Sequence, residues 1–141
     1  MTFAKWAFRV AGIYGVLTLA PMYFAEGAIS TMTPPAITHP EYFYGWISAA
    51  LVFQFLFLLI SVDPRRYRPV MIVAVLEKVT WLAALWPLGA MGRVRGSPLV
   101  IGSVDALWAV RFAVSWLRTA PPRDGVSVGE TQHVGNSQHR R

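Results

Sequence analysis

Four stretches of apolar residues, each about 20 residues long, follow one another along this chain. A helix rises 1.5 Å per residue, so roughly 20 residues are needed to cross the ~30 Å hydrocarbon core of a bilayer. Inside a bilayer no water is present to bond the backbone, and a helix satisfies its own polar groups. The pattern therefore predicts an all-α fold, a four-helix transmembrane bundle. The stretches are residues 6–25, 43–62, 70–88 and 98–117.

The chain changes character after the fourth stretch. Residues 119–141, TAPPRDGVSVGETQHVGNSQHRR, are polar and show no periodic apolar pattern. Such a segment cannot bury enough apolar surface to offset the conformational entropy lost on folding. We therefore predict two parts, a transmembrane bundle at residues 1–118 and a disordered polar tail at residues 119–141.

The basic residues are distributed unevenly over the ends of the spans. The net charge is +6, yet the connection 26–42 contains neither Lys nor Arg. Cytoplasmic segments of multi-span proteins carry the excess of Lys and Arg. The distribution predicts that both termini are cytoplasmic, and it explains the positive charge without a nucleic-acid partner. The residues concerned include Lys5, Arg9, Arg65, Arg66, Arg68 and Arg118.

The connections between spans predict which helices are neighbours. The short turn DPRRYRP predicts an antiparallel hairpin of the second and third spans, and loop 89–97 makes the third and fourth spans neighbours. Pro21 lacks a backbone donor, so we expect a kink or an early end of the first span there. Small residues favour close helix contacts in membranes. Those noted are Ala11 and Gly15 in the first span and Gly102, Ala106, Ala109 and Ala113 in the fourth.

Each span carries a polar or charged residue at a similar depth. Counted from the cytoplasmic end of its span, Glu77 lies about seven residues in, or ~10 Å. Gln54 and Arg111 lie at about the same depth. Ionisable residues inside a membrane are rare and are functional candidates by default. We therefore predict a layer that binds a ligand or forms ion pairs, made of Tyr14, Gln54, Glu77, Lys78, Trp81, Asp105, Trp108 and Arg111.

The four charges of this layer cancel. Their depths favour a pair of Glu77 with Arg111 and a pair of Lys78 with Asp105. Asp105 and Arg111 are not expected to share a face, since six residues turn a helix by about 600°. Two interpretations remain open. The charges can form a binding or proton-exchanging site centred on Glu77, or they can simply fix the register of the helices.

A second candidate site lies at the outer rim, where Glu26, His39 and Glu41 occur. A histidine between two acids can act as a general acid–base or a weak metal ligand. The stretch also has a local explanation, because Thr38 and Glu41 match a capping box at a helix start. The chain has no cysteine, which excludes disulfides, thiol redox chemistry and Cys-ligated metals. We expect neither a metal nor a cofactor.

Three motifs resemble a group of small bacterial four-span membrane proteins. They are HPEYFYGW at the opening of the second span, DPRRYRP in the turn and LEK in the third span. More distantly, the layout of residues 1–118 is similar to that of DoxX-like proteins, some of which are linked to quinol oxidation. The resemblance implies a multi-pass protein of the bacterial plasma (inner) membrane, and it carries over no catalytic residue.

The sequence leaves three functions open. The first is a small integral membrane protein without evident catalytic machinery, which binds a partner subunit, a lipid or a quinone-like apolar ligand around the charged layer. The alternative is a proton-coupled small-molecule transporter that works as a homodimer and uses Glu77. A further alternative is an intramembrane lipid-modifying enzyme, which needs an acid and a base facing one cavity.

Overall fold

The computed structural model describes residues 2–32 and 35–121, and the regular structure of this part is entirely helical. Four helices are long and apolar enough to cross a membrane, which confirms the predicted all-α bundle of four spans. The tail that we predict to be disordered lies, from residue 122 onward, outside the described residues. The elements are α1 (Thr2–Leu19), the 3-10 helix η1 (Ala20–Phe24), α2 (Glu26–Met32), α3 (Pro40–Val62), α4 (Arg68–Ala90) and α5 (Ser97–Arg118).

The first span ends in two steps. The α-helical part stops at Leu19, and η1 continues to Phe24 with Pro21 in its first turn. Pro21 has no N–H to donate to a carbonyl one turn back, so regular α-helical bonding ends here and the predicted early end is confirmed. The short α2 that follows is not predicted, because seven residues are too few to show a helical apolar period.

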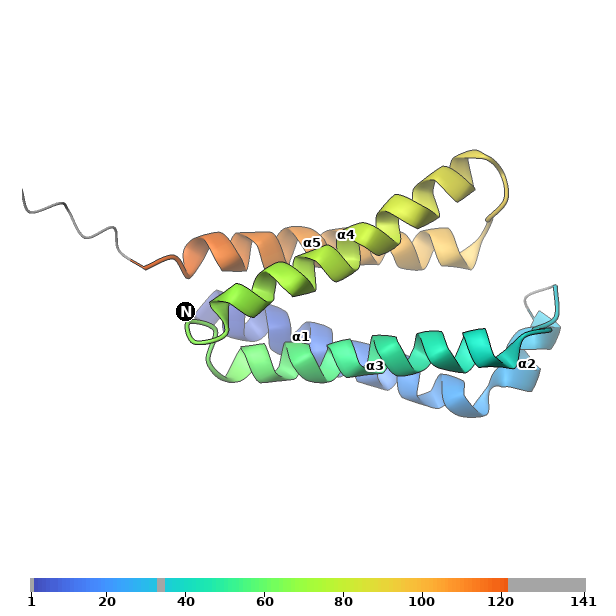
Figure 1. Ribbon diagram of the computed structural model, residues 1–141, viewed down its shortest axis with the longest axis horizontal. Helices are drawn as coiled ribbons and strands as arrows, with labels where there is room; N and C mark the ends of the chain where they lie inside the picture. The colour runs from blue at the N-terminus through green and yellow to red at the C-terminus, as the bar shows by residue number, and fades with distance from the viewer. Residues whose placement is uncertain (1, 33–34, 122–141) are drawn as a thin grey trace, which may run out of the picture.

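The spans form two tight pairs. Helix α1 packs chiefly on α3, and α4 packs chiefly on α5. Figure 1 shows the first pair, in blue and green, below the second pair, in yellow-green and orange. The predicted contact of the third and fourth spans is confirmed. The second and third spans run antiparallel out of their turn as predicted, but they diverge toward the far end, so their hairpin is open (Figure 1). The short turn fixes their direction and leaves their angle free.

A cluster of phenylalanines joins the two pairs at the end of the bundle where α1 begins and α5 ends. Phe8, Phe57 and Phe112 have no exposed surface, and the rings of Phe8 and Phe112 stack with centroids 4.2 Å apart. Met71 and Ala74 of α4 complete the contact, so all four spans meet here. Aromatic pairs of this kind contribute about 0.5–1.5 kcal/mol beyond their buried area. The cluster therefore holds the pairs together at this end.

The outside of the bundle is apolar, while several polar side chains lie inside. Leu17, Val52 and Val110 are largely exposed, whereas Gln54 and Ser115 are buried. A helix bundle in water has the opposite distribution, with its apolar stripes inward and its polar faces outward. The arrangement suits hydrocarbon surroundings and is consistent with a small multi-pass membrane protein.

Glycines allow the close contacts within both pairs. A Cβ built on Gly12 would lie 2.9 Å from the backbone oxygen of Gln54, and one built on Gly15 would collide with the Gln54 side chain. In the second pair, a Cβ on Gly102 would collide with the side chain of Leu85. Helices in membranes approach closely where their residues are small. Gly15 and Gly102, both noted in the sequence, therefore lie at contacts between helices.

We expect Gly12→Ala to destabilise the protein, because a backbone oxygen cannot move aside without separating α1 from α3. Overpacking of this kind costs about 1–3 kcal/mol. Gly45→Ala in α3 is the matched control, since nothing lies within 4 Å of a Cβ at Gly45. Thermal unfolding in detergent should show a lower Tm for Gly12→Ala and an unchanged or higher Tm for Gly45→Ala. Equal Tm values for the two variants would contradict the close contact.

Candidate functional site

A cavity of about 460 Å³ opens where the two helix pairs diverge. All four spans contribute aromatic side chains to its wall, among them Tyr14, Phe53, Trp81 and Trp108. Phe57 belongs both to this wall and to the phenylalanine cluster, so the cluster closes one end of the cavity. Small-molecule sites are typically concave, about 300–1,000 Å³ in volume, and mainly apolar with a few polar groups. The cavity has the size and lining of such a site.

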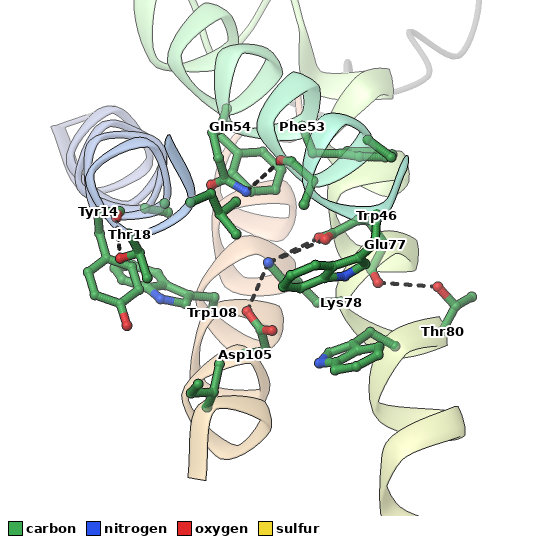
Figure 2. A pocket seen from close by; sticks show the side chains of 18 of the residues that line it. Tyr14, Thr18, Trp46, Phe53, Gln54, Glu77, Lys78, Thr80, Asp105 and Trp108 are labelled. Carbon is green, nitrogen blue, oxygen red and sulfur yellow. Dashed lines mark hydrogen bonds and ion pairs between the residues drawn. The ribbon is translucent and has the colours of Figure 1, made fainter. Parts of the chain in front are cut away.

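Three charged side chains meet at the cavity (Figure 2). Lys78 Nζ lies 2.8 Å from Asp105 Oδ1 of α5 and 3.2 Å from Glu77 Oε2 of its own helix. The Lys78 side chain is 9% exposed, and those of Glu77 and Asp105 are 19% and 20% exposed. We refer to these three residues as the charged triad. The predicted pair of Lys78 with Asp105 is confirmed.

The predicted pair of Glu77 with Arg111 is wrong. Glu77 pairs with its chain neighbour Lys78, and the guanidinium of Arg111 lies over the Trp108 ring, 5.1 Å from the ring centroid. Arg111 follows Asp105 by six residues, so it points to a different side of α5, as the helical period requires. The sequence predicts a similar depth for Glu77 and Arg111, but the direction around each helix decides which side chains meet.

Apart from Arg111, the predicted polar layer lines one open volume. The Tyr14 ring lies 6.5 Å from the Trp108 ring, and Gln54 Nε2 donates to the carbonyl oxygen of Ala50 at 3.0 Å. The indole N–H of Trp108 is buried and has no hydrogen-bond partner among residues 2–32 and 35–121. The layer therefore borders a cavity that a ligand can enter. Its members there are Tyr14, Gln54, Glu77, Lys78, Trp81, Asp105 and Trp108.

The charged triad is short of hydrogen-bond donors. Its formal charges sum to −1, because two carboxylates share the single ammonium group of Lys78. Lys78 Nζ donates to Glu77 Oε1 at 3.4 Å, while the buried Oε2 has the ion pair with Lys78 and no hydrogen bond from the described part of the chain. A buried acceptor is most stable when a donor satisfies it, so the triad has room for a further donor. The Lys78 ammonium also lies 5.5 Å from the centroid of the Phe57 ring, which adds a cation–π contact.

Several residues of the cavity wall carry no signal in the sequence. Ala49, Ala50 and Ala84 leave the cavity wide because their side chains are short. Small residues in a span predict close packing of helices as readily as open space. Trp46 also lines the cavity, although a tryptophan near a span end is typical of an interface anchor. Only the angles between the helices distinguish these alternatives.

The residues of the outer rim form two separate pairs. His39 Nδ1 lies 3.2 Å from Glu41 Oε1, with side chains 67% and 63% exposed. Tyr44 donates to Glu26 Oε2 at 2.8 Å. In the part of the chain that the structure describes, no group of three or more His, Cys, Asp or Glu side chains is placed to hold a metal ion.

The predicted capping box is wrong. His39, one residue later than Thr38, precedes the first helical residue of α3, and no side chain caps this helix. The Glu41 carboxylate contacts the His39 ring instead. The first helical residue is Pro40, which has no N–H, so this helix end has one donor fewer to satisfy.

We expect Lys78→Met to lower the stability strongly, since it leaves two largely buried carboxylates without a counter-charge. Removing one partner of a buried ion pair costs about 3–5 kcal/mol. Adding Asp105→Asn to this variant should restore part of the loss, because one uncompensated charge disappears. Lys5→Met is the control, since no ion pair within residues 2–32 and 35–121 involves Lys5. Thermal unfolding in nanodiscs measures the Tm of each variant. Equal Tm values for Lys78→Met and Lys5→Met would rule out a stabilising triad.

In comparisons with known proteins, no family model, curated protein or solved structure matches this chain. The resemblance to small bacterial four-span proteins and to DoxX-like proteins stays a prediction. Function must therefore be argued from the geometry, charge and lining of the site itself.

Proposed function

We propose that this chain is a small integral membrane protein that binds a largely apolar ligand with a polar head group, such as a lipid or a quinone-like molecule. The cavity between the helix pairs carries the proposal, because aromatic walls and three charged side chains border one volume of about 460 Å³. The apolar body of the ligand fits the aromatic and alanine walls. Its polar head lies against the charged triad.

The charges of the triad favour a particular kind of head group. Lys78 already contacts two carboxylates, so a head group that only accepts hydrogen bonds must compete with both of them. A hydroxyl or amine head can instead donate to the carboxylates of Glu77 and Asp105. Hydrogen bonds to charged groups contribute about 1.5–3 kcal/mol. A quinol or a hydroxylated lipid therefore suits the site better than a quinone.

We also propose that the protein lies in the bacterial plasma (inner) membrane with both termini cytoplasmic. The start of α1 and the end of α5 lie at the same end of the bundle as the turn between α3 and α4 (Figure 1). Arg65, Arg66 and Arg68 belong to this turn or follow it directly, and Arg118 ends α5. An excess of basic residues at one end supports a cytoplasmic position for that end.

The cavity can be filled without changing the charged triad. We expect Ala84→Phe to weaken the binding of decylubiquinol by about tenfold or more, since overpacking and ligand displacement each cost at least ~1 kcal/mol. Ala83→Phe is the matched control, because Ala83 is exposed and does not line the cavity. Tryptophan fluorescence in nanodiscs, with empty nanodiscs as the blank, measures Kd. Equal Kd values for both variants and the wild type would show that the cavity is not the binding site.

The position of Glu77 favours a second function, proton-coupled transport of a small molecule by a homodimer. The Glu77 carboxylate borders the cavity, is 19% exposed and shares Lys78 with Asp105. A proton or a cationic ligand can therefore compete with Lys78 for this carboxylate. The cavity of about 460 Å³ is small for a pathway across the membrane, so we expect two copies to form the pathway.

We expect Glu77→Gln to abolish movement of ethidium driven by a pH gradient across proteoliposomes, since the amide cannot exchange a proton. Glu41→Gln is the control, because the Glu41 side chain is 63% exposed at the opposite end of α3 from its turn to α4. Wild-type rates in Glu77→Gln would exclude a coupling role for Glu77. Absence of ethidium movement in the wild type would leave ligand binding as the function.

A further inference from the structure

Arg111 lies outside the cavity, at a groove of about 250 Å³ between α1 and α5. The α1 side chains in this groove recur at intervals of three and four residues, so they form one stripe along the helix. Trp6 is 60% exposed and Val10 is 44% exposed, so the stripe faces the surroundings of the bundle. The groove is lined by Phe3, Trp6, Ala7, Val10, Trp108 and Arg111, of which Trp108 also borders the cavity.

The charge of Arg111 has no partner of opposite sign in the described part of the chain. None of the ion pairs within residues 2–32 and 35–121 involves Arg111 or Arg118. Arg118 follows two turns later on the same side of α5, ~10 Å along the helix axis. Each guanidinium lies 5.1 Å from an aromatic centroid, Arg111 over Trp108 and Arg118 over Phe3. A cation–π contact offsets only part of the cost of an arginine inside a span.

The geometry points to an anionic phospholipid as the occupant of this groove. Its phosphate oxygens accept hydrogen bonds from Arg111 and Arg118, and an acyl chain lies along the exposed stripe of Phe3, Trp6 and Val10. The guanidinium group has parallel N–H donors that match a phosphate, which makes arginine the preferred residue for such contacts. The site is independent of the ligand proposed for the cavity.

The surrounding charge also favours an anionic lipid. The groove lies near the end of the bundle where α1 begins and α5 ends, and the arginine-rich turn before α4 lies at this end as well (Figure 1). Basic residues close to a membrane surface attract anionic lipids, and basic pockets between spans bind their head groups. The groove and its end of the bundle therefore attract the same class of lipid.

Every carboxylate among the described residues of a second copy already has a partner within its own chain. The two carboxylates of the charged triad contact Lys78, and those of the outer rim lie at the opposite end of the bundle. Asp63 accepts two backbone N–H groups within the turn between α3 and α4. An exposed groove with Arg111 in its wall and Arg118 beside it, over the Phe3 ring, is therefore better completed by a lipid than by another protomer.

Native mass spectrometry tests this inference on the full chain released from nanodiscs that contain equal amounts of phosphatidylglycerol and phosphatidylcholine. We expect the wild type to retain phosphatidylglycerol about tenfold more often than phosphatidylcholine. Arg111→Gln should lose most of this preference, because it removes the charge and the parallel donors. Arg65→Gln is the matched control, since it makes the same change at an exposed arginine of the turn. It should keep the preference.

Three results would overturn the inference. The first is equal retention of the two lipids by the wild type, a measurement that needs no variant. The second is an equal loss of preference in Arg111→Gln and Arg65→Gln, which would mean attraction to the basic end as a whole. The third is conversion of a dimer to a monomer by Arg111→Gln, which would place a second copy in the groove. If Arg111→Gln does not fold, Arg111→Lys replaces it, and a reduced preference is expected because lysine lacks the paired donors.

Discussion

The close approach of α1 to α3 is the constraint on which the rest of the structure depends. Gly12 and Gly15 leave no room for a Cβ against α3, so these two helices form a tight pair. Gly102 has the same role between α4 and α5. The phenylalanine cluster then joins the two pairs at the end of the bundle where α1 begins and α5 ends. Because tight contacts lie within the pairs, the pairs diverge beyond the cluster, and the cavity is the consequence.

The charged triad is compatible with both interpretations that the sequence leaves open. Lys78 connects α4 to α5 through Asp105, within one helix pair, so it helps to hold that pair in register. The same three side chains border the cavity, and both carboxylates keep part of their surface exposed. A pure register lock needs no open volume beside it. The cavity is therefore the observation that favours a binding role in addition to a structural one.

The sequence predicts the helices well, and their mutual orientation poorly. Hydropathy and span length are properties of single segments, so four spans and the early end at Pro21 follow from local rules. The pair of Lys78 with Asp105 also follows, because both residues lie at similar depths in neighbouring helices. The pair of Glu77 with Arg111 fails because depth is only one coordinate. The angle around each helix axis is the other, and it depends on packing contacts far along the chain.

The direction of Arg111 around the axis of α5 also explains how the charges are arranged. Pairing of Glu77 with Arg111 would leave every charge of the layer neutralised inside the bundle. Instead, Trp108 borders both the cavity, which Glu77 lines, and the groove, which Arg111 lines. On one side, the charged triad has a formal charge of −1, and on the other side Arg111 has a charge of +1. Each surface therefore suits a group of the opposite sign, and we propose a donor or cation for the cavity and a phosphate for the groove. A layer that is neutral as a whole thus provides two sites of opposite charge.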